Sequence, residues 1–186
     1  MIFVSYYTIS TGYEKEFHNL EKSFKEFNLE YEIDAIQSQG DWFANCFYRA
    51  TFLKQKLLRH KQPVVWIDCD AIVRRYPEFL FQLNCDFACY IHTRKSKVKE
   101  LFGGTMYLNY TENSFKLLDL WCQLVMKRDT CRIIFDQVYL HTAMQYLLRE
   151  GLQFIELPAT YCQIFDTMKD VGNPVIEHFQ ASRRLR

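Results

Sequence analysis

Membrane-spanning segments and disulfide signatures are both missing from this 186-residue sequence. No apolar stretch approaches the about 18 residues that a transmembrane helix needs, and the first residues lack the basic and apolar segments of a secretory leader. The seven cysteines form no CxxC pair, and several lie within apolar runs, where a thiol packs as a small hydrophobe. These absences predict a cytoplasmic protein with reduced cysteines.

An excess of charge of either sign is also absent, because 23 basic residues nearly balance 22 acidic ones. This balance removes the strong overall field that dominates non-specific nucleic-acid binding. What is present is a globular composition, with 49% hydrophobic and 17% aromatic residues and no internal repeat. We expect a single domain over residues 1–186, in which residues 180–186 form a basic, flexible C-terminal tail.

The first half of the chain alternates strand and helix patterns. Residues 2–8 are rich in β-branched and aromatic side chains and predict a strand. Apolar residues then recur with the period of an amphipathic helix, at Tyr13, Phe17, Leu20, Phe24 and Phe27. A short strand near 30–35, a helix near 43–60 and a strand at 63–68 follow. Three strands separated by two helices predict an α/β fold with a largely parallel sheet.

The second half predicts further strands and two more helices. The expected elements are, in chain order, a strand at 86–91, a polar loop from His92 to Lys99, a turn at Gly103 and Gly104, a strand at 104–109, helices at 112–127 and 134–149, and short strands near 153–157 and 175–178. The polar loop carries four basic residues, Arg94, Lys95, Lys97 and Lys99, a pattern typical of a solvated surface loop and compatible with an anionic partner.

Two carboxylates stand at the end of the most apolar strand. Residues 63–70 read Pro-Val-Val-Trp-Ile-Asp-Cys-Asp, and the four apolar residues from Val64 predict a strand buried on both faces. Side chains alternate along an extended segment, so Asp68 and Asp70 are expected on the same side. Two neighbouring acids repel unless a cation or hydrogen-bond donors compensate. The pair therefore predicts a divalent-metal site where open α/β sheets bind ligands, although a solvated turn or a helix cap is the structural alternative.

Two chemistries use such a pair. In phosphatases of the haloacid dehalogenase type, the first Asp is a nucleophile and the second a general acid. That motif normally opens the first strand and is followed by a second acidic pair, whereas Asp68 and Asp70 come after two strand-helix units. In nucleotide-sugar transferases the pair instead holds a metal ion that bridges the donor's diphosphate, and the position within this chain suits that role.

The ordered set of motifs resembles the GT-A glycosyltransferases, near the glycogenin-like group of nucleotide-diphospho-sugar transferases. The resemblance rests on six segments: the strand from Ile2 to Thr8, the helix with Tyr48-Arg49 and Lys54, Val-Val-Trp-Ile-Asp-Cys-Asp (64–70), Phe-Gly-Gly-Thr-Met-Tyr-Leu-Asn (102–109), Phe-Asp-Gln-Val-Tyr-Leu (135–140) and Ile-Glu-His-Phe (176–179). It implies a GT-A-like, Rossmann-type and mostly parallel sheet flanked by helices.

The same resemblance assigns residues to donor binding. Tyr6, Tyr7 and Thr8 would contact the nucleoside, with a tyrosine ring available for stacking on the base. Arg49 and Lys54 would approach the donor sugar or the diphosphate from the second helix. The structural alternatives are a strand that ends in two tyrosines and a solvated helix face.

Two further segments would lie at the donor sugar. Gly103 and Gly104 would let the backbone come close to the sugar, since residues without Cβ leave room and allow positive φ. Asp136 and Gln137 would lie beside the reacting carbon as the catalytic residues, while a helix N-cap is the alternative for Asp136.

The metal set and the C-terminal arginines complete the implied site. Asp68 and Asp70 would bind Mn²⁺ or Mg²⁺ with His178 as third ligand, and an imidazole ligand favours tolerance of manganese. The Gly and Lys-Pro-Trp segment that usually follows this histidine is missing, so Arg183 or Arg184 would bind the diphosphate in its place.

These assignments predict a metal-dependent glycosyltransferase, transferring a hexose or pentose from a nucleoside diphosphate sugar to an acceptor hydroxyl. A UDP-sugar donor and retention of configuration are favoured, and the acceptor stays open among protein, lipid-linked sugar, polysaccharide and modified nucleic-acid base. The alternatives are a non-catalytic module that binds nucleotide-sugar or metal, and the phosphatase described above.

Overall fold

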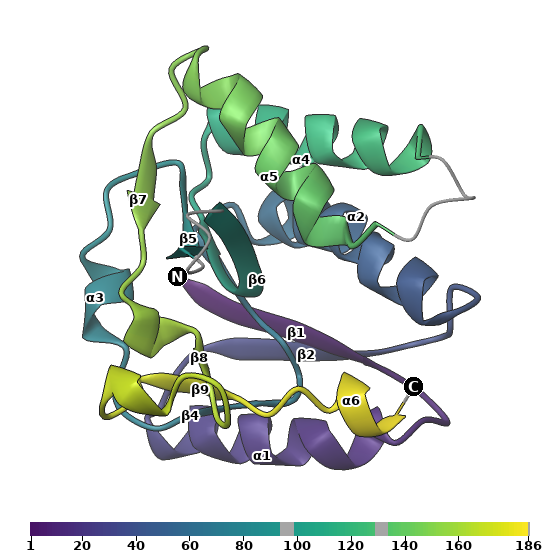
Figure 1. Cartoon of the computed structure of the whole chain (residues 1–186), viewed down its shortest axis with the longest axis vertical. Coiled ribbons are helices and arrows are strands. Elements are labelled where there is room, and N and C mark those ends of the chain that lie inside the picture. The colour runs from purple at the N-terminus through teal and green to yellow at the C-terminus, as the bar shows by residue number, and fades with distance from the viewer. Residues whose placement is uncertain (94–98, 129–133, 186) are drawn as a thin grey trace.

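A computed structural model of the chain describes residues 1–93, 99–128 and 134–185 (Figure 1). Its centre is a six-stranded sheet in the order β2-β1-β3-β6-β5-β7. The strands of this sheet are β1 (Ile2–Thr8), β2 (Tyr31–Ile36), β3 (Val64–Ile67), β5 (Phe87–Thr93), β6 (Lys99–Leu108) and β7 (Phe154–Glu156). β1 pairs in parallel with β2 and β3, and β5 pairs in parallel with β7. β6 runs antiparallel to its neighbours β3 and β5, so the sheet is mostly parallel, as predicted.

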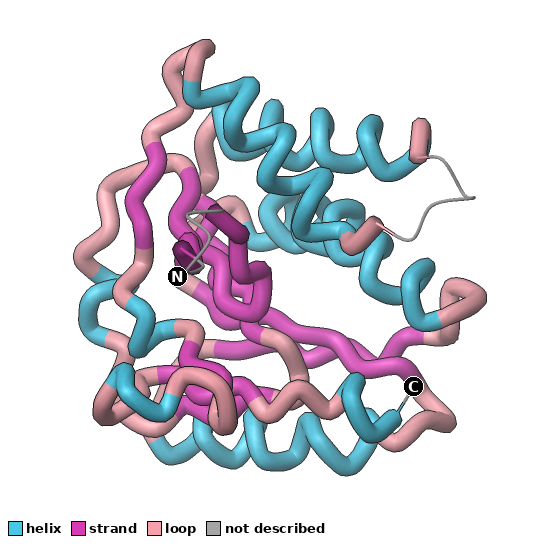
Figure 2. Tube along the Cα trace, viewed as in Figure 1, coloured by secondary structure: helices cyan, strands magenta, loops and turns pink. Residues whose placement is uncertain are grey.

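Helices and a small second sheet cover the two faces of the central sheet (Figures 1 and 2). The helices are α1 (Tyr13–Glu26), α2 (Trp42–His60), α3 (Glu78–Phe81), α4 (Glu112–Met126), α5 (Asp136–Leu148) and α6 (Ser182–Leu185), with short 3-10 turns η1 (Ala159–Tyr161) and η2 (Lys169–Val171). α2, α4 and α5 lie together on one side, and α1 lies on the other with the small sheet. The molecule is thus a three-layered α/β domain.

The alternation of side chains along β3 divides the core in two. Val64 and Trp66 belong to the cluster beneath α2, α4 and α5, while Val65 and Ile67 belong to the cluster beneath α1. All four residues are buried, as predicted for a strand with both faces covered. The strand is therefore held rigidly from both sides at the point where the two acids follow it.

The small sheet brings the C-terminal part of the chain to the end of β3. It consists of β4 (Ala71–Val73), β8 (Gln163–Ile164) and β9 (Ile176–His178). β9 pairs antiparallel with β4, and this register sets His178 opposite Ala71. The sequence predicted the strand at 175–178 but not its partner β4, which has only three residues.

One prediction about backbone conformation was wrong. Gly103 and Gly104 form no turn and have no positive φ, because they lie inside β6, where the pairing with β5 shifts between Cys89 and Tyr90. In the segment predicted to be a flexible tail, Ala181 is buried and α6 follows it. Arg94, Lys95, Lys97 and Arg186 lie outside the described residues. Among the described helices, none combines the length and apolarity needed to cross a bilayer.

Candidate active site

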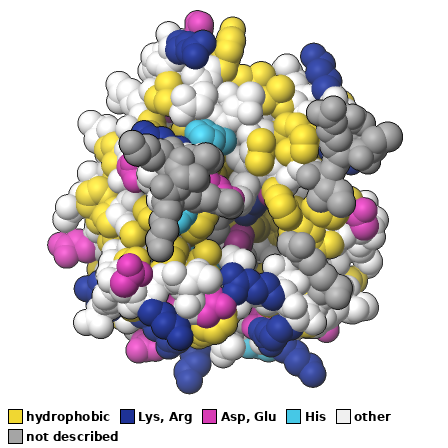
Figure 3. Space-filling model, viewed as in Figure 1, with side chains coloured by type: hydrophobic (Ala, Val, Ile, Leu, Met, Phe, Trp, Pro, Cys, Tyr) yellow, Lys and Arg dark blue, Asp and Glu magenta, His cyan; other side chains and the backbone are white. Residues whose placement is uncertain are grey.

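A cavity of about 470 Å³ opens at the carboxyl ends of β1 and β3, within the usual size range of small-molecule sites. Figure 3 shows this face of the molecule, with side chains of both charges around a central hollow. One wall comes from α2, whose Trp42, Asn45, Cys46 and Arg49 follow helical spacing and all line the cavity. The opposite walls come from the residues after β3, from β6 and from the start of α5.

Asp68 and Asp70 lie at the base of this cavity, but strand alternation is not what orients them. The chain leaves the extended conformation after Ile67, and Ala71 N donates to Asp68 O at 3.0 Å in a tight turn. Asp68 N in turn donates to Gly104 O at 2.9 Å, which fixes the turn against β6. The predicted convergence of the two acids is present, produced by a turn between β3 and β4.

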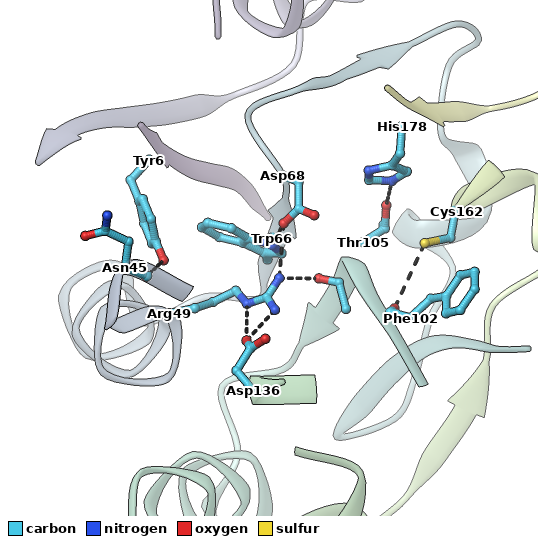
Figure 4. Close-up of polar contacts among 11 residues, drawn as sticks. Tyr6, Asn45, Arg49, Trp66, Asp68, Phe102, Thr105, Asp136, Cys162 and His178 are labelled. Carbon is cyan, nitrogen blue, oxygen red and sulfur yellow. Dashed lines mark hydrogen bonds and ion pairs between the residues drawn. The ribbon is translucent and has the colours of Figure 1, made fainter. Parts of the chain in front are cut away.

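His178 joins the two acids from β9. Carboxylate oxygens of Asp68 and Asp70 and a ring nitrogen of His178 all lie within 4.8 Å of one another. The imidazole is 2% exposed, and its Nε2 lies 2.9 Å from Thr105 Oγ1 (Figure 4). Its Nδ1 is buried without a hydrogen-bond partner among the described residues, a costly arrangement that a ligand would relieve. Burial lowers the pKa of His178 to about 4, so the ring is neutral and suited to donate a lone pair to a metal.

Gly104 explains how the imidazole fits. A Cβ at residue 104 would lie 2.8 Å from His178 Cε1 and 2.9 Å from Nδ1, closer than packed atoms approach. Only glycine leaves this space, so the sequence was informative here for a reason other than positive φ. At Gly104 the backbone comes close to His178 of the protein, whereas the resemblance implied a close approach to the donor sugar.

The acids are incompletely compensated by the protein. Burial raises the pKa of Asp68 to about 6 against the lowering effect of Arg49. Burial and the charge of Asp68 raise the pKa of Asp70 to about 6, although His178 and the Ala181 amide act in the other direction. Ala181 N donates to Asp70 Oδ2 at 2.6 Å, so the C-terminal segment is attached directly to the site. Two carboxylates and a neutral imidazole form a donor set that fits a divalent cation such as Mn²⁺.

Arg49 connects the group formed by Asp68, Asp70 and His178 to α5 (Figure 4). Its Nη1 donates to Asp68 Oδ1 at 3.0 Å and to Gly103 O at 2.7 Å, and its Nε donates to Asp136 Oδ2 at 3.1 Å. The buried guanidinium lies 5.5 Å from the Trp66 ring centroid. One cation therefore holds acids from β3 and α5 together, and this fork geometry is one that lysine cannot reproduce.

The end of β1 contributes to the cavity wall differently from the prediction. Tyr6, Tyr7 and Thr8 all line the cavity. However, the Tyr6 hydroxyl donates to Asn45 O at 2.6 Å, and its ring packs in the core against Trp66. The Tyr7 ring is stacked on Phe17, at 4.1 Å between centroids. Both tyrosine rings thus already have partners within the protein.

Two of the predicted basic residues lie outside the cavity lining. Lys54 pairs with Asp119 of α4, because five residues after Arg49 a helix has turned by about 140°. Arg184 pairs with Glu16 at 3.1 Å, away from the cavity. Arg183, in contrast, lines the cavity and pairs with Asp166.

The structure also places residues at the cavity that the sequence analysis did not select. Trp42 Nε1 donates to Tyr13 OH at 3.2 Å, a contact that joins the starts of α1 and α2. Gln137 Nε2 donates to Glu100 Oε1 at 3.4 Å, which joins α5 to β6. The helical spacing from Trp42 to Arg49 was a signal that could have found the α2 residues, whereas nothing in the sequence places Glu100 near Gln137.

No family model matches the sequence, and no curated protein matches it. Several solved structures have the same fold. A glycosyltransferase involved in the glycosylation of the major capsid of PBCV-1 has a TM-score of 0.72 at 13% identity, covering 96% of this chain and 92% of that chain. The glycosyltransferase GlyE of Streptococcus pneumoniae TIGR4 gives 0.63 at 16% identity, and this chain spans 54% of it. The galactosyltransferase LgtC, solved with donor and acceptor sugar analogues, gives 0.62 at 10% identity, with 97% and 87% covered.

The chain therefore has the GT-A fold, which the resemblance of its motifs implied. At such low identities the likeness shows the fold, and the function has to be argued from the site itself.

Proposed function

We propose that this protein is a metal-dependent glycosyltransferase that moves a sugar from a nucleoside diphosphate sugar to an acceptor hydroxyl. The observation that carries the proposal is the group formed by Asp68, Asp70 and His178 at the base of the cavity, on a GT-A fold. The three solved structures named above are glycosyltransferases, which supports transfer of a sugar in general.

In the proposed reaction the bond between the anomeric carbon and the diphosphate oxygen breaks, and the nucleoside diphosphate leaves with the bonding electrons. A new bond forms between the anomeric carbon and the acceptor oxygen, and the acceptor proton passes to the leaving diphosphate. A Mn²⁺ or Mg²⁺ ion bound by Asp68, Asp70 and His178 would offset the charge that develops on the diphosphate. Arg183, which lines the cavity, supplies a second positive charge from the protein.

Arg49 and Asp136 are the residues best placed to orient the donor sugar. Each is buried, and their ion pair leaves the Asp136 carboxylate fixed rather than available as a base. Gln137 lines the cavity beside them and offers an amide to sugar hydroxyls. We expect retention of configuration, and NMR of the product's anomeric centre tests this. An inverted product would instead point to Glu100 as the base.

Tyr13 is a better candidate than Tyr6 or Tyr7 for stacking on the nucleotide base of the donor. It lines the cavity at the start of α1, and its hydroxyl lies on Trp42 rather than in the core. A UDP-sugar is our first choice of donor, and comparison of nucleotides decides this.

The direct test is thermal unfolding of the purified protein with UDP, GDP, CDP or ADP, each with Mn²⁺ and again with EDTA. A ligand that binds only the native state raises the free energy of unfolding, and this rise grows with the logarithm of the ligand concentration once it exceeds the dissociation constant. We expect a metal-dependent rise for one nucleotide, absent in Asp70→Asn. Asp119→Asn is the matched control, since Asp119 pairs with Lys54 outside the cavity. Absence of a rise with every nucleotide contradicts the proposal, and binding without sugar transfer would identify a non-catalytic module.

A further inference from the structure

Three aromatic rings stand together at the rim of the cavity. Trp42 and Phe43 begin α2, and Phe135 immediately precedes α5. The ring centroids are 5.0 Å apart for Trp42 and Phe43, 5.9 Å for Phe43 and Phe135, and 6.2 Å for Trp42 and Phe135. Trp42 and Phe135 line the cavity, and Phe135 is 40% exposed. Two separate helices thus build one aromatic surface at the rim, which we call the aromatic platform.

Hydrogen-bonding groups lie in the same cavity wall. Gln137, two residues after Phe135, donates through Nε2 to Glu100 Oε1 at 3.4 Å, and both residues line the cavity. An amide can donate and accept, and a carboxylate can accept several hydrogen bonds. Between Phe135 and Gln137 lies Asp136, and Arg49 connects it to Asp68. The platform and the polar pair therefore flank the residue assigned to the donor sugar.

This combination matches the chemistry of a sugar ring. A pyranose has a face of CH groups that covers an aromatic ring and an edge of hydroxyls that needs donors and acceptors. A peptide acceptor added as an extra strand would need a sheet edge. The edges of the central sheet are β2 and β7, whereas β1, β3 and β6, which reach the cavity, are internal strands. The small sheet brings its edge strand β8 to the cavity at Ile164, but β8 has two residues, which is too short to pair with an added strand.

We propose that the aromatic platform and the Gln137–Glu100 pair form the acceptor subsite, and that the acceptor is a carbohydrate. The acceptor ring stacks on Phe135 and Trp42, and its hydroxyls bind Gln137 and Glu100. One acceptor hydroxyl then faces the anomeric carbon of the donor near Asp136. This inference rests on the proposed function, because the subsite is an acceptor subsite only if a donor binds next to it.

Saturation-transfer NMR tests the inference without a nucleotide. The probes are methyl β-D-glucoside, methyl β-D-galactoside and methyl α-D-mannoside, with N-acetylserine methylamide as a hydroxyl-bearing peptide mimic. We expect saturation transfer to the ring CH protons of at least one glycoside. In Phe135→Ala this transfer signal should fall about tenfold. Gln137→Ala should weaken it too. Tyr146→Ala is the matched control, since Tyr146 is a 58% exposed aromatic residue of α5 that does not line the cavity.

The result is separable from that of the nucleotide experiment. Phe135→Ala should keep the Mn²⁺-dependent stabilisation by nucleotide, and Asp70→Asn should keep the glycoside signal. A nucleotide effect without any Phe135-dependent glycoside signal overturns the acceptor inference, as does preferential binding of the serine mimic. A Phe135-dependent glycoside signal without any nucleotide effect would leave a carbohydrate site and reject the proposed transferase.

Discussion

Asp86 and Asp70 are both acids at strand ends in one small domain, and the protein treats them in opposite ways. Asp86 precedes β5 and accepts hydrogen bonds from Thr111 Oγ1 at 2.6 Å, Gln153 N at 2.9 Å and Asn113 Nδ2 at 3.1 Å. Burial alone would raise the pKa of Asp86, but these donors outweigh it and lower that pKa. The pKa of Asp70, in contrast, is raised to about 6.

The difference separates an acid that stabilises the fold from the acids to which we assign the metal ion. Asp86 connects β5, the start of α4 and the segment before β7, so its charge is satisfied by the protein. Asp68 accepts from Arg49 and from Trp66 Nε1, whereas Asp70 accepts from the Ala181 amide, and the two acids repel each other. An acid pair kept in this state costs stability, and a bound cation would recover it.

Loss of Arg49 should have the largest effect, since Arg49 is a buried cation that pairs with both Asp68 and Asp136. Arg49→Met leaves Asp136 buried without its partner, and we expect a loss of about 3–5 kcal/mol in the free energy of unfolding. Denaturant unfolding measures this. Lys54→Met is the control, because the Lys54–Asp119 pair is half exposed and should contribute less than about 1 kcal/mol. Equal losses in the two variants would contradict the role of Arg49.

Removal of the Asp70 carboxylate should abolish the proposed function while sparing the fold. Asp70→Asn is expected to weaken Mn²⁺-dependent nucleotide binding by at least about 100-fold, since loss of a ligand exceeds the effect of losing its supporting partners. The free energy of unfolding without metal should stay the same or rise, because a repulsion disappears. Calorimetric titration and denaturant unfolding of the same preparation give the two values. A variant that unfolds more readily would make Asp70 a structural acid like Asp86.

Asp86→Asn should show the reverse pattern. Asparagine cannot accept all three hydrogen bonds, so we expect a loss of about 1–3 kcal/mol in the free energy of unfolding. Nucleotide binding below the unfolding temperature should be unchanged, since Asp86 does not line the cavity. A variant with normal stability and impaired binding would break the comparison.

The pH dependence of stability should differ in sign between the two acids, with the smallest effect of the set. Asp86 has a lowered pKa, so its contribution is present above its ordinary value of 3.8 and is lost as pH falls through the folded-state pKa. Asp70 has a raised pKa, so the metal-free folded state binds more protons between pH 3.8 and about 6 and loses stability as pH rises. The free energy of unfolding is measured against pH in EDTA for wild type and for each Asn variant. The difference between wild type and variant gives the contribution of Asp86 or of Asp70. Equal slopes would contradict the account.

Much of the fold could be predicted because the patterns are local. The strand at 2–8 and the helices near 43–60 and 112–127 match β1, α2 and α4 to within a residue or two. β4 was missed because three residues carry no period of their own, and its partner β9 lies about a hundred residues later in the chain. Gly103 and Gly104 were predicted to form a turn because two glycines are unusual inside a strand. The reason for them is tertiary, since Arg49 packs on Gly103 and His178 packs on Gly104.

The site was predictable where short motifs carry the chemistry. Asp68, Asp70 and His178 were selected from the sequence, and the structure brings them together. Lys54 was assigned to the donor from the resemblance, and the structure places it outside the cavity lining, paired with Asp119. Glu100 meets the cavity through tertiary contacts alone, so a single sequence contains no signal for it, whereas Phe135 lies in the 135–140 motif but was given no role there.

The most direct test of the central claim is electron paramagnetic resonance of Mn²⁺ titrated into the protein with the nucleotide that stabilises it. Bound Mn²⁺ loses the sharp six-line signal of the aqueous ion, so binding is read without any assay of activity. The account predicts a single bound Mn²⁺ per chain in wild type and in Asp86→Asn, and none in Asp70→Asn. Equal binding in Asp70→Asn and wild type would show that the metal lies elsewhere and would contradict the assignment of this cavity.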